Sequence, residues 1–440
     1  MPHVVFRPSL LAAAAVLFGS AWATAAPLPV EDAIRAAWNN NPGVAASREM
    51  VAAARADAES ARDRRLPTLQ LQAKAVATKE PVAAFGLRLD EQRITQADFD
   101  PTRLNSPDLT GGVGASATLM QPLYMGGRLT AGRKAAEDQS HSEEWTHARR
   151  LQEMSFNVVQ AYFGAQVAVE ALRYADDVLA QARETESFAR ARNQQGLALD
   201  ADVARATAFR AQAEADRVAA AQRLASARAA LTLLVGDDAA AAELSTPLVS
   251  KTGRLAEVAS ADRPDLKAAH LRANAARHMV EASRGSLLPE VMATATVETM
   301  RSAFDQGGTW YTLGLLARWN FSLADARATK AARERASAAR SAELWQERQA
   351  QHEVGEARRA LDAAETRVQS AAEAVSASES ARRLRLERHR QGLLPLTDVL
   401  DAESALAGAR TLLLRSELEV RVATAQLELA LGQPIEGVKP

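Results

Sequence analysis

The amino-acid sequence predicts a mainly α-helical chain with transmembrane β-strands, in which long-helix coiled-coil hairpins occur twice. Three observations predict this fold class. Glycine-centred turns recur at one fixed spacing, long Ala-rich segments keep apolar residues three and four positions apart, and four short segments alternate apolar with polar residues. The pattern therefore predicts two helical hairpins and four strands in each chain.

The composition fits long packed helices better than a globule with a large aromatic core. Of 440 residues only 5% are aromatic, and much of the apolar content is alanine, the strongest helix former. The formal net charge of −1 lacks the basic excess of most nucleic-acid-binding proteins. Because the chain has no cysteine, disulfides, thiol nucleophiles and a lipid-modified N-terminal cysteine are excluded.

Residues 1–25 have the three parts of a secretory signal peptide. Arg7 supplies positive charge, Leu10 to Phe18 form an apolar run, and Ala23-Thr24-Ala25 is a cleavage motif. A transmembrane anchor would need roughly 20 apolar residues, and this run is shorter. We therefore expect export, and no transmembrane helix in the rest of the chain.

Proline residues mark where the helices that follow begin or end. A short helix is predicted over Val30 to Asn40 and ends at Asn41-Pro42, because proline lacks an N–H and disfavours helix in the residue before it. A second helix runs from about Gly43 to Arg65. A counterpart in the second half opens at Arg263-Pro264 and ends near Leu287.

Four segments of about 10 to 14 residues alternate apolar and polar side chains, which predicts strands with two unlike faces and enough length to cross a bilayer at a tilt. Alternation alone also fits a half-buried sheet in a soluble sandwich. Four strands cannot close a barrel, since bacterial barrels have at least eight, so lipid-facing strands would require several chains, and three chains give twelve strands. The segments are residues 68–78, 112–125, 290–302 and 309–322.

The linkers between paired strands differ. Residues 79–110 contain Pro81, Pro101 and Pro107 and are predicted as an irregular loop, on the outside of the cell if the strands form a barrel. Residues 305–308 predict a tight hairpin turn.

A helix of roughly 100 Å is predicted from Arg128 to about Asn193. Its apolar residues step by three and four, as in a coiled-coil seam, and the arm that begins at Val399 does the same. Helices this long must pack along one another. The seam residues are Leu151, Met154, Val158, Ala161, Ala165, Ala168, Leu172, Ala175, Leu179 and Ala182, and then Val399, Ala402, Leu406, Ala409, Leu413, Ser416, Val420, Ala423, Leu427 and Ala430.

Two hairpin tips carry matching glycines. Gly196-Leu197 and Gly392-Leu393 each precede an Asp-Val pair by six residues, and later glycines at Gly236 and Gly432 repeat the same spacing of 196 (392 − 196 and 432 − 236). This register indicates an internal duplication. We expect a first structural repeat over 26–236, a connector over 237–262 and a second repeat over 263–440, with almost nothing added after Gly432.

No catalytic pattern is found. The sequence has no Gly-rich phosphate loop, no H-E-x-x-H motif and only dispersed histidines, so we expect no enzyme, no metal and no cofactor. Asp398 and Asp401 lie three apart just after the second tip and share one helix face. They fit either acids that favour a helix N-terminus or, in a symmetric trimer, a ring of six carboxylates that makes a cation-selective, closable constriction.

Taken together, these features resemble the TolC family of outer-membrane efflux and secretion channels over essentially the whole mature chain. Residues 121–128 read Gln-Pro-Leu-Tyr-Met-Gly-Gly-Arg, which is similar to the family's entry into its long helix. Residues 390–402 are similar to its second tip. The second repeat lacks the Gly-Gly pair at the matching exit, Asn320 to Asp325.

The resemblance implies a homotrimer with a twelve-stranded outer-membrane barrel, a periplasmic helical tunnel, a periplasmic adaptor and an inner-membrane pump or ABC transporter. It implies that Asp398 and Asp401 form the pore gate and that Asp202 helps to lock it. His389 stands where the family's best-known member has the tyrosine of that lock, and Leu394 where it has an arginine. The adaptor-docking tips would be Gly196, Leu197, Gly392 and Leu393.

These observations predict a passive trimeric exit duct of a tripartite efflux pump or a type I secretion system, with no nucleic-acid partner. Its substrate, whether drug, metal ion or polypeptide, stays open. The alternative is a periplasmic coiled-coil adaptor or scaffold without a pore. An exported hydrolase would need converging polar residues that the sequence does not contain.

Overall fold

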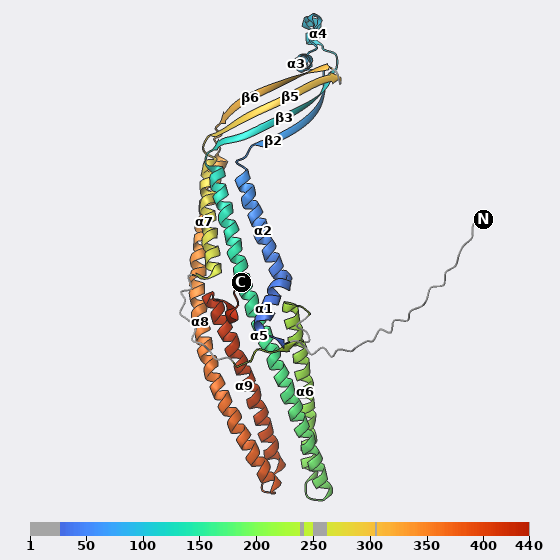
Figure 1. Ribbon diagram of the computed structural model, residues 1–440, viewed down its shortest axis with the longest axis vertical. Coiled ribbons are helices and arrows are strands. Elements are labelled where there is room, and N and C mark those ends of the chain that lie inside the picture. The colour runs from blue at the N-terminus through green and yellow to red at the C-terminus, as the bar shows by residue number, and fades with distance from the viewer. Residues whose placement is uncertain (1–26, 238–241, 250–261, 304–305, 440) are drawn as a thin grey trace, which may run out of the picture.

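A computed structural model describes residues 27–237, 242–249, 262–303 and 306–439. The expected signal peptide and much of the connector lie outside these residues. The molecule is elongated, with a sheet at one end and long helices that run away from it to two hairpin tips (Figure 1). The element order helix, two strands, long helix, shorter helix occurs twice.

The first series consists of α2 (Pro42–Asp63), β2 (Thr68–Thr78), β3 (Thr110–Met125), α5 (Arg128–Gln194) and α6 (Asp200–Val235). The second consists of α7 (Pro264–Gly285), β5 (Glu290–Ala303), β6 (Gln306–Arg318), α8 (Leu323–Arg390) and α9 (Leu396–Leu431). Helix α1 (Val30–Asn40) precedes them. Short strands β1 (Pro27–Leu28) and β4 (Glu243–Leu244) pair in parallel beside it and tie the connector to the N-terminal segment.

The large sheet is antiparallel in the order β2-β3-β5-β6. Its register places apolar residues in rows across all four strands, for example Leu71, Ala117, Val297 and Tyr311. The opposite face carries polar rows, such as Gln70, Thr118, Thr296 and Thr312, and the Lys74–Glu298 ion pair at 2.5 Å. The alternation in the sequence therefore separates the two faces across the whole sheet.

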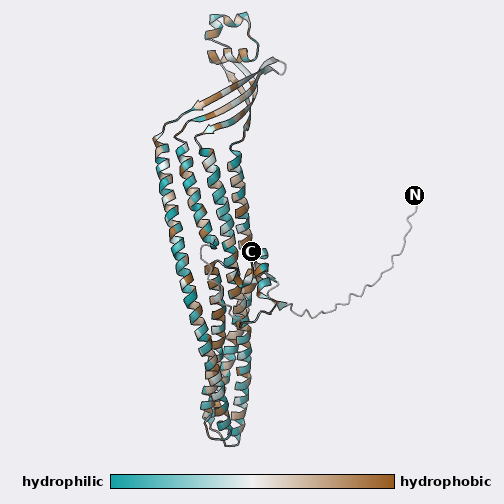
Figure 2. Cartoon of the chain, turned by 60° about the vertical axis from the view of Figure 1, so that its left-hand side comes forward, coloured by the Kyte–Doolittle hydropathy of each residue, from teal (hydrophilic) through white to brown (hydrophobic). Residues whose placement is uncertain are grey.

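The apolar face of this sheet is uncovered. Leu71 is 73% exposed, Leu313 74% and Tyr311 77%, and none of the described long helices lies over the strands (Figure 2). A contiguous apolar face of this kind marks a surface that is covered by lipid or by another protein. A sheet in a soluble sandwich would have buried it, so that interpretation is wrong for the described chain.

Residues 79–110 do not form the irregular loop that the prolines predicted. They form α3 (Pro81–Asp90), a 3₁₀ turn η1 (Gln96–Phe99) and α4 (Pro101–Asn105) beyond the ends of the strands (Figure 1). Pro81 and Pro101 each occupy the first turn of a helix, where the missing N–H costs nothing. Phe85 packs edge-on against Phe99 at 5.6 Å between ring centroids.

The second strand pair also differs from expectation. Gln306, Gly307 and Gly308 belong to β6 and pair with β5, so they are not the turn; the connection itself, 304–305, lies outside the described residues. Trp319 and Phe321 follow the end of β6 and stack on each other with ring centroids 4.7 Å apart. They form an aromatic pair where the sheet meets the helices.

The two exits from the sheet are built differently. Gly126 has φ +61°, and a Cβ there would lie 2.2 Å from the carbonyl oxygen of Gly285 at the end of α7. Only glycine fits this close approach of two backbones. At the second exit the Ser322 hydroxyl instead accepts a hydrogen bond from the Ala324 N–H and caps α8.

Each long helix packs along its shorter partner, α5 with α6 and α8 with α9. Most residues of the predicted seams are buried, including Val158 and Ala182 in α5 and Leu406 and Leu427 in α9. Among the described helices, α6 alone is long and apolar enough to cross a membrane. This differs from the expectation that no helix after the signal peptide could do so. Arg210 and Arg217 of α6 pair with acids of α5, so α6 acts here as a hairpin arm.

The main apolar core lies at the waist, where α1, α5, α6 and the C-terminal residues meet. Tyr162, Phe163 and Ile34 are fully buried in it. The segment after Gly432 contributes a 3₁₀ turn, η4 (Ile435–Gly437), whose Ile435 is 1% exposed. The expectation that this segment adds almost nothing is therefore wrong.

Candidate functional site

Both hairpin tips close through the same backbone motif. Gly196 (φ +73°) donates to the Asn193 carbonyl at 2.8 Å and Leu197 to the Arg192 carbonyl at 2.8 Å. Gly392 (φ +77°) repeats the first bond with His389 at 2.9 Å, and Leu393 the second with Arg388 at 2.9 Å. These paired bonds satisfy the last carbonyls of each long helix and need a residue that tolerates positive φ. Leu197 and Leu393 both project into solvent.

The next helix begins at an equivalent place in each tip, but its first turn is held differently. Asp202 is the third residue of α6, and its carboxylate accepts the Leu199 N–H at 3.4 Å. Asn193 reinforces this tip by donating to the Ala198 carbonyl and the Asp200 carboxylate, both at 3.0 Å. Within one chain Asp202 therefore has a local helix-capping role.

Asp398 is the third residue of α9, 196 positions after Asp202, and Asp401 follows one turn later. Asp398 is half-buried and Asp401 is exposed. Within the part of the chain that the structure describes, neither carboxylate has a hydrogen bond or an ion pair. Both are thus available to ions or to another chain.

His389 stays within its own hairpin. Its Nδ1 lies 2.8 Å from the Leu394 carbonyl oxygen, so it spans the second tip and does not reach Asp202. Arg385, one turn earlier on α8, donates to the Asp398 carbonyl at 3.3 Å. Two side chains of α8 therefore contact the backbone of the tip, His389 before α9 begins and Arg385 in its first turn.

The two hairpins touch each other just above the tips. Leu396 at the start of α9 packs between Ala189 of α5 and Ala206 of α6. Arg382 of α8 donates to Glu403 of α9 at 2.6 Å and to Gln181 of α5 at 3.1 Å. These contacts set where Asp398 and Asp401 stand relative to α5 and α6.

Sequence reasoning missed Arg382 and Arg385. Both belong to the basic run Arg382 to Arg390 at the end of α8, where cations are favoured by the helix dipole. That run was a visible signal for a charged tip, but which of its members face α9 depends on how the helices pack.

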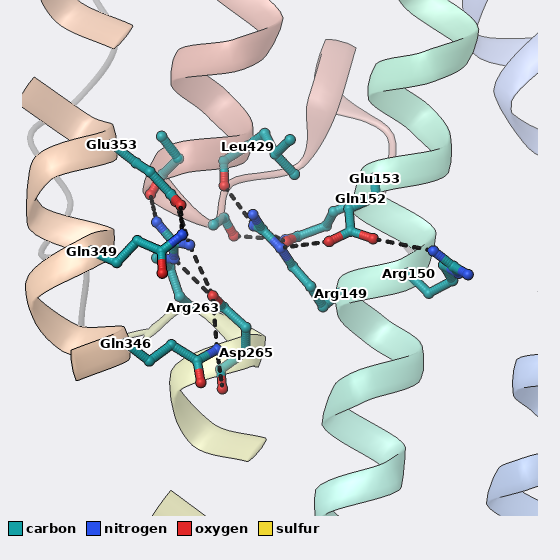
Figure 3. A network of polar contacts seen from close by, with 12 residues as sticks. Arg149, Arg150, Gln152, Glu153, Arg263, Asp265, Gln346, Gln349, Glu353 and Leu429 are labelled. Atoms are coloured by element: carbon teal, nitrogen blue, oxygen red, sulfur yellow. Dashed lines mark hydrogen bonds and ion pairs between the residues drawn. The ribbon is translucent and has the colours of Figure 1, made fainter. Parts of the chain in front are cut away.

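A second polar cluster ties four helices together at the waist (Figure 3). Arg263 is 2% exposed; its guanidinium donates to Asp265 at 2.8 and 3.0 Å, to Glu353 at 2.8 Å and to the Ala430 carbonyl at 3.0 Å. Arg149 donates to the Leu429 carbonyl at 2.8 Å. Two arginines thus donate to two of the C-terminal carbonyls of α9.

These charges perturb the pKa of Asp265. Burial alone would raise it, but hydrogen bonding to Arg263 and the nearby Arg149 outweigh burial and lower it. Arg149 is itself buried, and this desolvation lowers its pKa. The cluster therefore consists of mutually dependent buried charges.

A third cluster, the waist acid pair, consists of Glu428 of α9 and Glu436 of η4. The Glu428 carboxylate accepts the Glu436 N–H at 3.1 Å. Arg421 lies beside them, donates to Glu436 at 3.2 Å and holds the connector carbonyls of Pro247 and Leu248 at 2.5 and 2.8 Å. Burial raises the pKa of Glu428 to about 7, and burial also raises that of Glu436.

The waist acid pair predicts that stability falls as pH rises. The folded Glu428 holds its proton up to about pH 7, whereas an unfolded glutamate loses it near pH 4.5. Its contribution is therefore complete below about pH 4.5 and is lost by about pH 7, a change of up to about 3 kcal/mol. Glu428→Gln should flatten the profile of the melting temperature between pH 5 and 8, measured by circular dichroism, and raise it at pH 8.

Glu419→Gln, an exposed acid earlier on α9 that pairs with Arg367, serves as the control and should leave the slope unchanged. A slope that survives Glu428→Gln would contradict this assignment.

The comparisons with known proteins agree with this geometry. The family described as outer membrane efflux protein matches residues 33–237 and 255–433. Among curated proteins, none is similar enough in sequence to match the chain.

Solved structures share the fold at low identity. A membrane protein from Pseudomonas aeruginosa is 22% identical, with a TM-score of 0.79 over 92% of this chain and 93% of that one. The outer membrane protein VceC from Vibrio cholerae is 22% identical, with a TM-score of 0.78 over 92% and 96%. The open state of the MtrE outer membrane channel from Neisseria gonorrhoeae is 20% identical, with a TM-score of 0.77 over 93% and 90%.

Proposed function

Because the chain belongs to the outer membrane efflux protein family, we propose that three copies form a passive exit duct across the outer membrane and the periplasm. The resemblance to TolC-like channels that the sequence motifs indicated is thereby confirmed. The family consists of channels, not enzymes, and its members lie in the outer membrane with an extension into the periplasm. The single observation that carries the proposal is the uncovered apolar face of the sheet.

The sheet supports a barrel that is shared between chains. Its outer strands, β2 and β6, each have one edge without a partner in the described chain, and exposed edges of this kind are not tolerated in lipid. Joining β2 of one copy to β6 of the next removes every edge when three copies close a ring of twelve strands. The apolar rows then face lipid and the Gln–Thr rows face the passage.

The tips supply the proposed gate. Three copies bring three pairs of Asp398 and Asp401 around the axis, which makes six carboxylates. Such a ring favours cations and closes when the helices approach. In this proposal Asp202 and His389 belong to the lock that holds the tips together, although each has a partner within its own hairpin.

The tips also supply the proposed docking surface. Gly196-Leu197 and Gly392-Leu393 end the hairpins with exposed leucines, which suits contact with a periplasmic adaptor. Transport energy then comes from an inner-membrane pump or ABC transporter that the adaptor joins to the duct. The tripartite efflux and type I secretion arrangements fit equally.

A pore-free periplasmic scaffold is the alternative, favoured only by the long coiled-coil hairpins. The two are separated by inserting the purified full-length protein into planar bilayers. We expect discrete single-channel steps, and a cation preference from reversal potentials in a salt gradient. If the protein stays soluble without detergent and gives no single-channel steps, the pore-free scaffold is the function that remains.

A further inference from the structure

A groove of about 770 Å³ lies just below the sheet, where the helices begin. It is reached by α2, α5, α7 and α8, which stand side by side as one layer (Figures 1 and 2). One chain supplies all of the groove's walls.

The lining of this groove is strongly basic. Four arginines line it, and Asp57 is the one acid in the described lining. Ser60, Ser283 and Ser286 add hydroxyl groups. The arginines are Arg64 directly after α2, Arg128 and Arg133 of α5, and Arg335 of α8.

Much of this donor capacity is unused. Arg128 pairs with Glu290 at 2.8 Å and Arg133 with Glu137 at 2.8 Å, yet the buried Nε of Arg133 has no acceptor. Arg64 and Arg335 are exposed and form no ion pair with any residue that the structure describes. A buried donor without a partner is costly, so an anion in the groove would satisfy it.

We propose that this arginine groove binds a phosphate or carboxylate group of an anionic small molecule. Guanidinium groups match such groups with paired hydrogen bonds, and the volume is that of a typical small-molecule site. The role of the groove rests on the proposed trimer, in which one side of the helical layer faces the passage and the other faces outward. Each trimer then has three anion sites at the sheet end of the helices, far from the aspartate ring at the tips.

Two sources carry this chemistry. One is a soluble organic anion in transit through the passage. The other is the headgroup of an anionic phospholipid, because Trp319 and Phe321 at the same junction are exposed aromatic residues of the kind found at membrane interfaces. Both sources present an anionic oxygen group, a phosphate in the case of the lipid, to the same arginines.

The test variant is Arg64→Gln combined with Arg335→Gln. Both side chains are exposed and lack ion-pair partners, so their removal leaves no buried acid uncompensated. The matched control is Arg284→Gln combined with Lys330→Gln, which removes the same charge from two of the four helices around the groove, α7 and α8. At about 100° per residue these two positions lie about 140° from Met279 and about 160° from Ala328, both of which line the groove.

The first measurement is titration calorimetry of the full-length protein with inorganic phosphate in a neutral detergent. We expect phosphate to bind, the double variant to weaken binding at least about fivefold, and the control to match the wild type. The proposal is overturned if the wild type and the double variant bind phosphate equally, or if the control loses as much binding as the double variant. It is also overturned if the wild type binds no phosphate and no retained lipid occupies the groove.

Native mass spectrometry of protein extracted in mild detergent shows whether a lipid occupies the groove. Phosphatidylglycerol retained by the wild type and the control but lost from the double variant assigns the groove to a headgroup. Phosphate binding without retained lipid assigns it to a soluble anion. No lipid and no phosphate binding overturns the proposal. The same spectrum reports the number of chains, so a monomer would contradict the trimer while the groove, complete in one chain, is still tested.

Discussion

Replacing both Asp398 and Asp401 with Ala should raise single-channel conductance and lower the ratio of cation to anion permeability by roughly tenfold, the low end of the concentrating effect of a focused charge ring. The reason is that three chains lose six carboxylates at the narrowest part of the proposed passage. Neither carboxylate has a partner in the described chain, so the substitution breaks no internal bond. Conductance and reversal potentials in planar bilayers measure the two effects.

Asn substitutions separate charge from size. Asp398→Asn with Asp401→Asn should lower the cation preference as much as Ala does, with a smaller gain in conductance. As a control, Asp362→Ala with Glu373→Ala removes two exposed acids midway along α8 and should change neither quantity. Unchanged selectivity in the Asp398 and Asp401 variants would remove these residues from the gate.

Replacing Arg263 with Met should cost about 3–5 kcal/mol of the free energy of unfolding. The substitution keeps the length of the side chain but leaves Asp265 and Glu353 without their shared cation and the Ala430 carbonyl without a donor. Because Arg263 is 2% exposed, water cannot replace these bonds. Urea titration of the helical circular dichroism signal measures the loss.

The control for Arg263 is Arg367→Met, which removes an ion pair with Glu419 at 3.0 Å between side chains 56% and 48% exposed. Surface pairs of this kind contribute at most about 1 kcal/mol. Similar losses for the two variants would mean that burial gives the Arg263 cluster no special weight.

Much of the fold followed from local patterns in the sequence. The three-and-four spacing in α5 and α9 reports which face of each helix is buried, and the two-residue alternation in β3 and β5 reports which face of each strand is apolar. The tip glycines were equally readable, since Gly196 and Gly392 both adopt the positive φ expected of a helix end. These patterns are local, so they can be interpreted without knowing which elements pack against each other.

The errors have two causes, namely a residue type with more than one local use and contacts between residues that are distant in the sequence. Pro81 and Pro101 were interpreted as signs of an irregular loop, although proline also fits the first turn of a helix, as it does here in α3 and α4. The C-terminal segment has no periodic pattern, and only its packing at the waist buries Ile435 and raises the pKa of Glu428. Likewise, the contacts of Arg382 and Arg385 depend on the rotation of α8 against α9.

In the proposed assembly three chains share one barrel. The molar mass of the mature protein, measured after detergent extraction from purified outer membranes by light scattering corrected for bound detergent, shows whether they do. We predict a trimer, which closes the free edges of β2 and β6 and assembles Asp398 and Asp401 into a ring. A monomer in detergent would contradict the shared barrel.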